Sequence, residues 1–271
     1  MLIDWTTNIW LDAHLFAGDG AVRGMRSGVA RVDASPERHM ADVAAVADVF
    51  IVNALSWPRL GMHVPNDFVA EYVRRFPGRA IGFACVDPRD PGAADELRRA
   101  VGDLGMKGLK LAPTYQEFDP WCEEAWRIYA LADQLRIPIY WHQASAGNPR
   151  SVLEWADPTR LDRIARAFPD LVMILEHFGL PWGNVAVQML RKHPNMYADV
   201  SARLTRGWDM YNCLRQAMDY EVTGKILFGS DFPVQTTAEA MASLRAFARP
   251  QDGLPPIPAA VIEDIIANRP L

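Results

Sequence analysis

The sequence has few of the features that mark secreted, membrane-spanning or nucleic-acid-binding proteins. It contains three cysteines, Cys85, Cys122 and Cys213, which are widely spaced and form no CxxC pair. An odd number of scattered cysteines is not the framework of a disulfide-stabilised secreted protein. The net charge is −5, whereas a nucleic-acid-binding surface needs clustered Lys and Arg. We therefore expect a reduced protein without a nucleic-acid partner.

Long apolar runs and a secretory signal are also absent. The longest apolar stretches have the length of a strand, which is too short for a membrane-spanning helix. The first residues lack the basic segment, apolar segment and small-residue cleavage site of a secretory signal. We expect a cytoplasmic protein that acts on a small molecule and has no membrane partner.

Strand-length apolar runs recur along the whole chain. Half of the residues are hydrophobic and 23% are charged, which is ordinary for a globular protein with a sizeable core. Runs without polar alternation are typical of strands buried on both faces, as in parallel sheets. The expected strands are residues 2–4, 49–55, 80–86, 107–111, 137–142, 171–177, 195–201 and 225–231.

Amphipathic stretches with apolar residues three and four apart lie between these runs. The expected helices are residues 36–49, 67–76, 93–105, 121–135, 159–168, 182–193, 208–220 and 237–248. Eight strand–helix units without a linker predict one α/β domain over residues 1–271, a single (β/α)8 TIM barrel. The stretch from Ile9 to Ser35 is expected to be a long loop, either a substrate-contacting element or a plain surface insertion.

Ionisable residues follow several of the predicted strands, where TIM barrels carry their active sites. His142 and His177 end neighbouring strands, so both are expected to face the barrel mouth. An imidazole is neutral near pH 7 and can bind a metal or carry a proton. Asp231 follows the last strand and is either catalytic or the N-cap of the next helix, although Thr236 and Thr237 offer a better helix start. We predict that His142, His177 and Asp231 are catalytic.

Basic residues near two strands are candidates for binding an anionic substrate. Lys107 and Lys110 lie on opposite faces of one strand, and Lys110 is nearer to its C-terminal end. Lys110 either binds a substrate carboxylate or forms a structural ion pair. Arg203 and Arg206 follow the seventh strand and are either bidentate ligands of an anion or solvated surface residues.

Three further polar residues lie close to these candidates. Thr6 and Asn8 are two apart on the first strand, so they are expected to project together at its end. Glu176 alternates with His177 along the sixth strand. It is therefore expected to face the surrounding helices, in a structural pair.

Several motifs in a fixed order resemble the amidohydrolase-related family, in the branch with aminocarboxymuconate-semialdehyde decarboxylase and pyrone-dicarboxylate lactonase. The resemblance covers the full length and rests on IDWTTN, GFACVDP, GLKLAP, IYWHQ, ILEHFG, YADVS and, most specifically, ILFGSDFP. The family's usual pattern starts with Asp-x-His-x-His, whose histidines bind a divalent metal. Asp4 matches the aspartate, but the two histidines are replaced by Thr6 and Asn8.

The resemblance implies roles for the residues that are kept. His142 corresponds to a further metal ligand, His177 to a catalytic histidine, and Asp231 to a ligand or general base. Hydroxyl and amide oxygens bind zinc less well than imidazole does. His142 and Asp231 therefore remain as candidate ligands of a zinc or manganese ion, and the presence of a metal stays open. The family also suggests a homodimer.

We expect a hydrolase that acts on a small carboxylated lactone or amide, without a metal, as the resemblance to the lactonase branch implies. Asp231 would act as general base on water. His142 and His177 would orient the carbonyl group or stabilise the oxyanion. The expected substrate contacts are Thr6, Asn8, Lys110 and Arg203. The alternatives are a metal-dependent decarboxylase of an aromatic or enoic acid, and a catalytically inactive barrel that binds a ligand.

Overall fold

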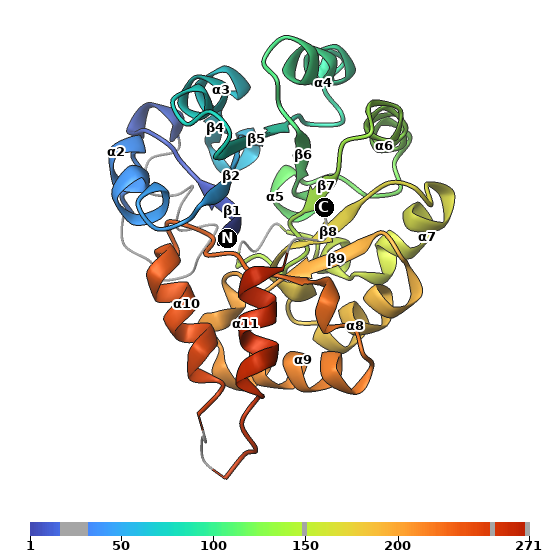
Figure 1. Ribbon diagram of the computed structural model, residues 1–271. Coiled ribbons are helices and arrows are strands. Elements are labelled where there is room, and N and C mark those ends of the chain that lie inside the picture. Colours follow the sequence, from blue (N-terminus) through green and yellow to red (C-terminus); the bar gives the residue numbers. More distant parts are fainter. Residues whose placement is uncertain (17–31, 148–150, 250–252, 269–271) are drawn as a thin grey trace.

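Eight parallel strands form a nearly closed barrel in the computed structural model, which describes residues 1–16, 32–147, 151–249 and 253–268 (Figure 1). Their order around the barrel is β1-β2-β5-β6-β7-β8-β9-β10. Every predicted strand overlaps one of them, so the predicted TIM barrel is confirmed. The barrel strands are β1 (Ile3–Asn8), β2 (Val49–Asn53), β5 (Ala80–Cys85), β6 (Gly108–Leu111), β7 (Ile139–Trp141), β8 (Met173–Leu175), β9 (Met196–Asp199) and β10 (Ile226–Leu227).

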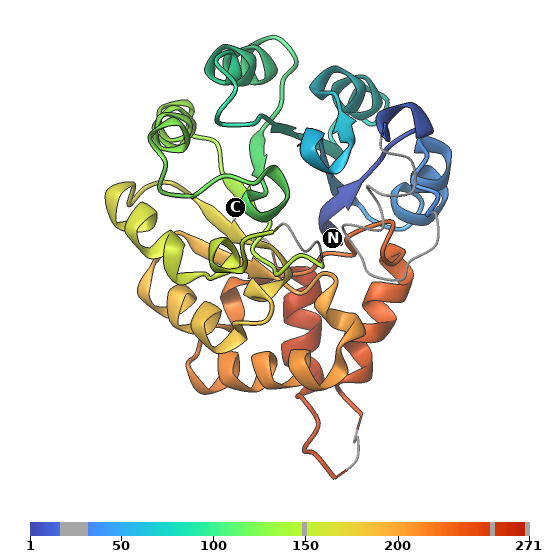
Figure 2. The ribbon, with the colours of Figure 1, turned by 180° about the vertical axis from the view of Figure 1, so that it is seen from behind.

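Helices surround the strands on the outside (Figure 2). Each predicted helix overlaps an observed one, while α5 and α11 were not predicted. The first predicted helix is a short α-helix that continues as a π-helical segment, Met40–Ala44. The helices are α2 (Pro36–His39), α3 (Asn66–Arg74), α4 (Ala93–Gly102), α5 (Pro113–Gln116), α6 (Glu123–Leu135), α7 (Thr159–Ala167), α8 (Gly183–Lys192), α9 (Gly207–Asp219), α10 (Thr237–Ala246) and α11 (Ala259–Ala267).

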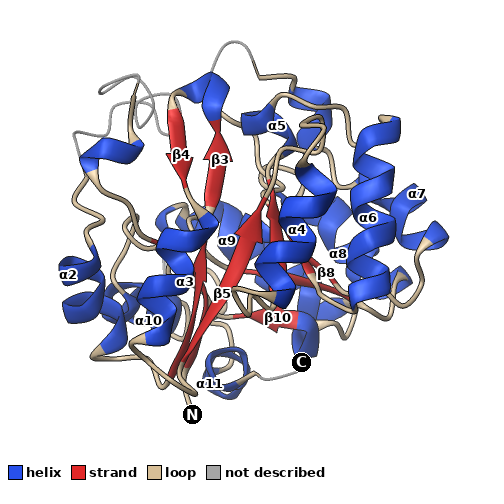
Figure 3. Cartoon of the chain, turned by 90° about the horizontal axis from the view of Figure 1, so that it is seen from above, coloured by secondary structure: helices blue, strands red, loops and turns tan. Residues whose placement is uncertain are grey.

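A two-stranded hairpin, β3 (Leu55–Trp57) and β4 (Met62–Val64), lies beyond the C-terminal ends of the barrel strands (Figure 3). It was not predicted, because its two strands are only three residues long. The predicted loop from Ile9 to Ser35 lies outside the described residues except for 9–16 and 32–35. The three cysteines are free thiols. None of the described helices has the length and apolar character needed to cross a membrane.

A bulge in β1 decides which side chains of that strand face the barrel mouth. The pairing of β1 with β2 shifts register between Asp4 and Thr7. Beyond the shift, Thr6 and Asn8 share a face, because the Asn53 amide donates to Thr6 Oγ1 at 3.0 Å and to Asn8 Oδ1 at 3.4 Å. The structure therefore brings Thr6 and Asn8 together at the strand end, as expected.

Hydrogen bonds between β1 and the chain after β10 close the barrel. Asp231 N donates to Thr6 O at 3.0 Å, and Asn8 N donates to Phe232 O at 2.9 Å. Asp4 on β1 stabilises the same junction, since its carboxylate accepts a hydrogen bond from Ser230 N at 2.9 Å. The closure of the barrel thus positions Asp231 beside Asn8.

The Asp4 carboxyl group links this junction to the start of α10. It is fully buried and accepts a second hydrogen bond from Thr237 Oγ1 at 2.7 Å. The start of α10 itself agrees with the prediction, because Thr236 Oγ1 accepts from Glu239 N at 3.1 Å as an N-cap. Burial raises the pKa of Asp4 to about 6, although its hydrogen bonds oppose this rise.

The raised pKa of Asp4 makes a testable prediction about stability. Folding favours the protonated acid, so its contribution is fully present below pH 4 and is lost as the pH rises through about 6. In Asp4→Asn the amide cannot ionise; its oxygen can accept from Ser230 N, and its NH₂ group can donate to Thr237 Oγ1, whose hydroxyl now accepts. The free energy of unfolding of the variant minus that of the wild type should therefore increase by about 3 kcal/mol between pH 4 and 7. Urea unfolding at several pH values measures this gain, and a difference that does not change with pH would contradict it.

Candidate active site

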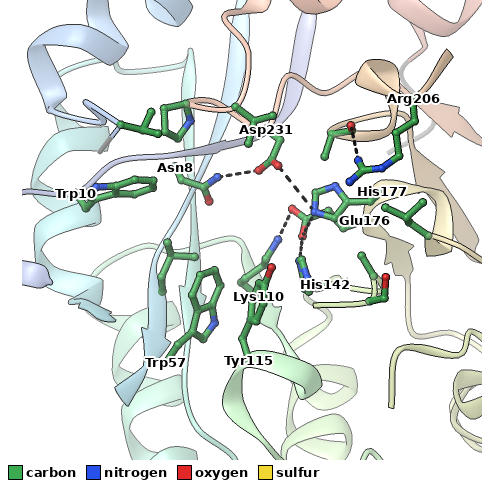
Figure 4. Close-up of a pocket in the computed structure, with 18 residues that line it drawn as sticks. Asn8, Trp10, Trp57, Lys110, Tyr115, His142, Glu176, His177, Arg206 and Asp231 are labelled. Carbon is green, nitrogen blue, oxygen red and sulfur yellow. Dashed lines mark hydrogen bonds and ion pairs between the residues drawn. The ribbon is translucent and has the colours of Figure 1, made fainter. Parts of the chain in front are cut away.

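A cavity of about 150 Å³ lies at the C-terminal ends of the barrel strands (Figure 4). Apolar and aromatic side chains from the barrel and from hairpin β3–β4 form part of its wall. Among its lining residues are Trp10, Leu55, Trp57, Tyr115, Leu180, Pro233 and Val234. Its polar and charged lining includes Asn8, Lys110, His142, Ser145, Glu176, His177, Arg206 and Asp231. All three residues predicted to be catalytic line this cavity.

A buried ion pair between Lys110 and Glu176 lies at the centre of this group. Both side chains are 2% exposed, and Lys110 Nζ contacts Glu176 Oε1 directly. Glu176 also accepts from Thr6 Oγ1 at 2.8 Å and pairs with His142 Nδ1 at 3.0 Å. Burial alone would raise the pKa of Glu176, but Lys110 and the neighbouring histidines hold that pKa well below its usual range. Glu176 is therefore an anion whose oxygens are already engaged.

His142 packs between this carboxylate and an aromatic wall. Its ring stacks on Tyr115 with centroids 4.2 Å apart and an interplanar angle of 28°. Burial lowers the pKa of His142, and the nearby Glu176 opposes that shift in part. The imidazole is therefore neutral at physiological pH.

His177 is oriented by residues that follow β9. Its Nδ1 lies 2.9 Å from Ser201 Oγ and 3.2 Å from the Ser201 carbonyl oxygen. Its Nε2 points at two carboxylates, 3.5 Å from Glu176 Oε2 and 3.9 Å from Asp231 Oδ2. Burial lowers the pKa of His177 to about 4, so this ring is also neutral near pH 7.

Asp231 is the carboxyl group that the cavity leaves most accessible. Its side chain is 15% exposed, and its Oδ1 accepts from Asn8 Nδ2 at 3.1 Å. Burial raises the pKa of Asp231 well above its ordinary value, and the negative charge of Glu176 adds to this effect. Its backbone has a φ of 54°, a left-handed conformation that is uncommon for a residue other than glycine. Such strain is typical of residues that are held for a function.

The prediction that Glu176 faces the helices is wrong. Ile174 packs in the cluster inside the barrel, so Glu176, two residues later, points the same way. His177 would then point outward, but the chain leaves the strand conformation, with φ of 59° at His177 and 53° at Phe178. This turn brings both side chains into the mouth. Counting alternation from Ile174 would have identified Glu176.

Arg203 and Arg206, which were both expected either to bind an anion or to be solvated, lie in different surroundings. Arg203 is fully buried and does not line the cavity. Its guanidinium donates to Phe178 O at 2.7 Å and to Asp209 Oδ2 at 2.9 Å, so it supports the turn that carries His177. Arg206 lines the cavity instead. The expectation that Arg203 contacts substrate therefore has no support in its position.

Thr6 and Lys110 also differ from simple substrate contacts. Thr6 is fully buried, is not among the described lining residues, and donates its hydroxyl hydrogen to Glu176. Lys110 does line the cavity, yet its ammonium group is paired with Glu176. Of its two expected roles, the structural ion pair is therefore the one that the structure shows. Lys107 is exposed and lies just before β6 rather than on it.

Comparison with known proteins agrees with this fold. The family model described as amidohydrolase matches residues 3–267. The chain belongs to the amidohydrolase family. One curated relative, the gamma-resorcylate decarboxylase of Polaromonas sp. strain JS666, is 33% identical over 88 residues. That match covers 28% of this chain and 26% of the relative, so the chain spans about a quarter of its length.

Solved structures with the same fold include an uncharacterised TIM-barrel protein, Bb4693 from Bordetella bronchiseptica, with a TM-score of 0.76 and 19% identity over 98% of this chain and 95% of that one. A 2,6-dihydroxybenzoate decarboxylase from Rhizobium has a TM-score of 0.67 and 16% identity over 97% and 95%. A probable 2-pyrone-4,6-dicarboxylic acid hydrolase from Acinetobacter baumannii has a TM-score of 0.64 and 13% identity over 90% and 91%. At these identities the likeness establishes the fold alone.

The first strand of this member of the amidohydrolase family does not offer the metal ligands that the family pattern implies. Thr6 Oγ1 is committed to Glu176. The Asn8 amide presents its NH₂ group to Asp231, and the same group donates to Phe232 O at 3.0 Å, which fixes the orientation of the amide. A hydrogen-bond donor therefore lies where a metal would need a lone pair.

The other side chains that could bind a metal already lie beside a cation, the Lys110 ammonium group. Ligand atoms of His142, Glu176 and His177 lie within 4.8 Å of one another. A metal on Glu176 would displace Lys110 and leave its ammonium group buried beside a dication without a counter-ion. The positive charge of Lys110 also acts on His142, His177 and Asp231. The residues of this site thus do not fit a divalent metal, which argues against the ligand pair expected from His142 and Asp231.

The ion pair makes a prediction about stability with a matched control on the same segment. Lys110→Met leaves the Glu176 carboxylate buried and without its cation, so the free energy of unfolding should fall by about 3 to 5 kcal/mol. Lys107→Met removes an exposed charge and should change it by less than about 0.5 kcal/mol. Adding Glu176→Gln to Lys110→Met should recover much of the loss, because no buried charge is left. Urea unfolding measures all three variants, and equal effects of the two lysine substitutions would contradict the assignment.

Proposed function

We propose that this amidohydrolase-family protein is a lyase that decarboxylates a small planar carboxylic acid, with Asp231 as the proton donor. The observation that carries the proposal is the contrast between the two carboxyl groups of the cavity. Glu176 is paired with Lys110, whereas Asp231 accepts a hydrogen bond from the neutral Asn8 amide and lies at the open side. Asp231 is therefore free to give a proton to a bound molecule.

The lining supplies a place for a planar anion. Arg206 lines the cavity, and within the described part of the chain its guanidinium donates a long hydrogen bond, 3.4 Å, to the Ala202 carbonyl oxygen. We assign the substrate carboxylate to this group, because a guanidinium binds carboxylates with two parallel hydrogen bonds. Trp10, Trp57 and Tyr115 provide flat apolar walls on the other side (Figure 4).

The chemistry needs one proton and no change of oxidation state in the protein. The bond between the carboxylate carbon and its neighbour breaks, and the electron pair stays on the neighbouring carbon. Carbon dioxide leaves, Asp231 delivers its proton to that carbon, and Asp231 regains a proton from water, so that each turnover leaves one hydroxide ion. The raised pKa of Asp231 suits this role, since an acid must be protonated before it can donate. The decarboxylases among the similar proteins support this reaction class.

Hydrolysis of a carboxylated lactone is the second candidate. It is supported by the fold shared with a probable pyrone-dicarboxylic acid hydrolase. Here Asp231 would take a proton from water, the oxygen of that water would attack the carbonyl carbon, and the ring oxygen would leave with the proton. Asp231 would have to be ionised, which its buried surroundings oppose. An inactive binding barrel is disfavoured because His142, His177 and Asp231 all line one cavity.

Asp231→Asn tests the role that both reactions assign to this residue. The amide keeps the size of the side chain but cannot transfer a proton, so turnover should fall at least about 100-fold. Asp103→Asn, at an exposed position outside the cavity, serves as the control and should leave turnover unchanged. Carbon dioxide release from a panel of aromatic and enoic acids, and ring opening of carboxylated lactones, provide the assays. Near-normal turnover in Asp231→Asn would remove Asp231 from the mechanism.

The pH dependence of kcat separates the two reactions. A decarboxylase that uses Asp231 as acid loses activity as the pH rises through the pKa of Asp231, which lies above its ordinary value of 3.8. A hydrolase that uses Asp231 as base gains activity over the same interval. If lactones are substrates and their turnover increases with pH, hydrolysis would replace decarboxylation as the proposed reaction.

A further inference from the structure

A buried carboxyl group at the end of β9 lies behind His177. Asp199 Oδ1 accepts three hydrogen bonds, from Ser201 N at 2.7 Å, from His177 N at 3.2 Å and from the Ser201 hydroxyl group. Its other oxygen, Oδ2, accepts from Tyr140 Oη at 2.6 Å. Asp199 and Ser201 are fully buried, and neither is among the described residues that line the cavity. Asp199 therefore reaches the site through the residues that it binds.

These contacts fix the hydrogen of the His177 ring on Nδ1. Nδ1 lies 3.2 Å from the Ser201 carbonyl oxygen, which can only accept a hydrogen bond. It also lies 2.9 Å from Ser201 Oγ, whose own hydrogen is donated to Asp199 Oδ1, so this oxygen accepts as well. Free histidine carries its hydrogen mainly on Nε2, so the surroundings of His177 impose the less common form. In this neutral ring Nε2 has a lone pair and can only accept.

The lone pair on His177 Nε2 influences where Asp231 holds its proton. Nε2 lies 3.5 Å from Glu176 Oε2 and 3.9 Å from Asp231 Oδ2. A lone pair beside two ionised carboxylates is unfavourable, and Glu176 is kept ionised by Lys110. Asp231 Oδ1 already accepts from Asn8, so the hydrogen of the neutral acid belongs on Oδ2, which faces Nε2. At 3.9 Å these two atoms are too far apart for a hydrogen bond, so the hydrogen stays available to a bound molecule.

We propose that Asp199 is a positioning residue, which through Ser201 holds His177 with Nε2 as an acceptor. This form of the ring makes Asp231 an acid rather than a base. With the ring hydrogen on Nε2 instead, that N–H group would point at Asp231 Oδ2 and stabilise the carboxylate. The form of the ring thus selects between the two reactions considered for this cavity, and it favours decarboxylation. The inference rests on the proposed function, because it explains why the proton donor keeps its proton.

Nuclear magnetic resonance measures the form of the ring in the resting protein, without substrate or turnover. Protein that contains histidine labelled with the heavy nitrogen isotope shows which ring nitrogen carries a hydrogen, and His177→Gln identifies the signals of His177. Near neutral pH, the wild type should carry this hydrogen on Nδ1. A hydrogen on Nε2 would overturn the inference.

Three substitutions separate positioning from a merely structural role, with kcat measured on the acid that releases most carbon dioxide. Asp199→Ala frees the Ser201 hydroxyl group to donate to Nδ1. The hydrogen of His177 should then lie at least partly on Nε2, and kcat should fall at least about tenfold while KM stays within about threefold. Asp199→Asn keeps an oxygen in place of Oδ1, and its NH₂ group can donate to Tyr140 Oη, so it should keep the ring form and keep kcat within about threefold. Tyr140→Phe removes a hydrogen bond from the other oxygen of Asp199 and should also keep both.

Several results with these variants would contradict the assignment. An unchanged ring form in folded Asp199→Ala, or an equal loss of kcat in Tyr140→Phe, would mean that Asp199 only supports the fold. If circular dichroism shows that Asp199→Ala does not fold, the wild type and Asp199→Asn decide the question. A ring hydrogen that moves to Nε2 in Asp199→Asn would overturn the inference, because this variant keeps the acceptor for the Ser201 hydroxyl group.

The outcomes for the ring and for turnover can be separated. A hydrogen on Nδ1 that depends on Asp199, with no carbon dioxide released from any acid of the panel, supports this inference and counts against the proposed function. Carbon dioxide release that depends on Asp231, from a protein whose His177 carries its hydrogen on Nε2, leaves the proposed function in place and overturns the role of Asp199.

Discussion

The buried ion pair between Lys110 and Glu176 determines the electrostatics of the whole cavity. An ammonium group that is 2% exposed needs a counter-ion, and Glu176, the residue that follows β8, supplies it. Once Glu176 is ionised, it fixes the hydrogen of His142 on Nδ1 and accepts from Thr6. Burial raises the pKa of Asp231, and the negative charge of Glu176 adds to that rise. One pair thus decides which groups accept, which donate and where a proton is held.

The same pair explains how the site can differ from the metal-binding pattern that the family implies. Thr6 and Asn8 replace the two histidines. Thr6 donates a hydrogen bond to the Glu176 carboxylate, and Asn8 donates one to that of Asp231. Lys110 provides a fixed positive charge inside the cavity, where a divalent ion would otherwise provide it. A monovalent cation held by its own counter-ion polarises a substrate less than a free dication does. The chemistry proposed for Asp231 therefore relies on proton donation.

Much of the fold and part of the site could be predicted from the sequence, because strand and helix periods are local properties. Eight buried runs and eight amphipathic stretches predict the barrel, and the strand ends identify His142 and Asp231. Glu176 was placed on the wrong face because its alternation was counted from His177, where the backbone has already turned out of the strand. The choice between Arg203 and Arg206 depends on a turn whose course no pattern shows. The hairpin over the mouth was missed because its strands are too short to show a period.

The metal content of the purified protein tests the central claim most directly. Untagged protein would be prepared without added metal or chelator and examined by plasma mass spectrometry, together with His142→Ala. If the Lys110–Glu176 pair takes the place of the metal, zinc and manganese should both be far below one equivalent per chain in the wild type. Near-stoichiometric metal that disappears in His142→Ala would contradict the account, because the cavity would then hold a dication beside Lys110.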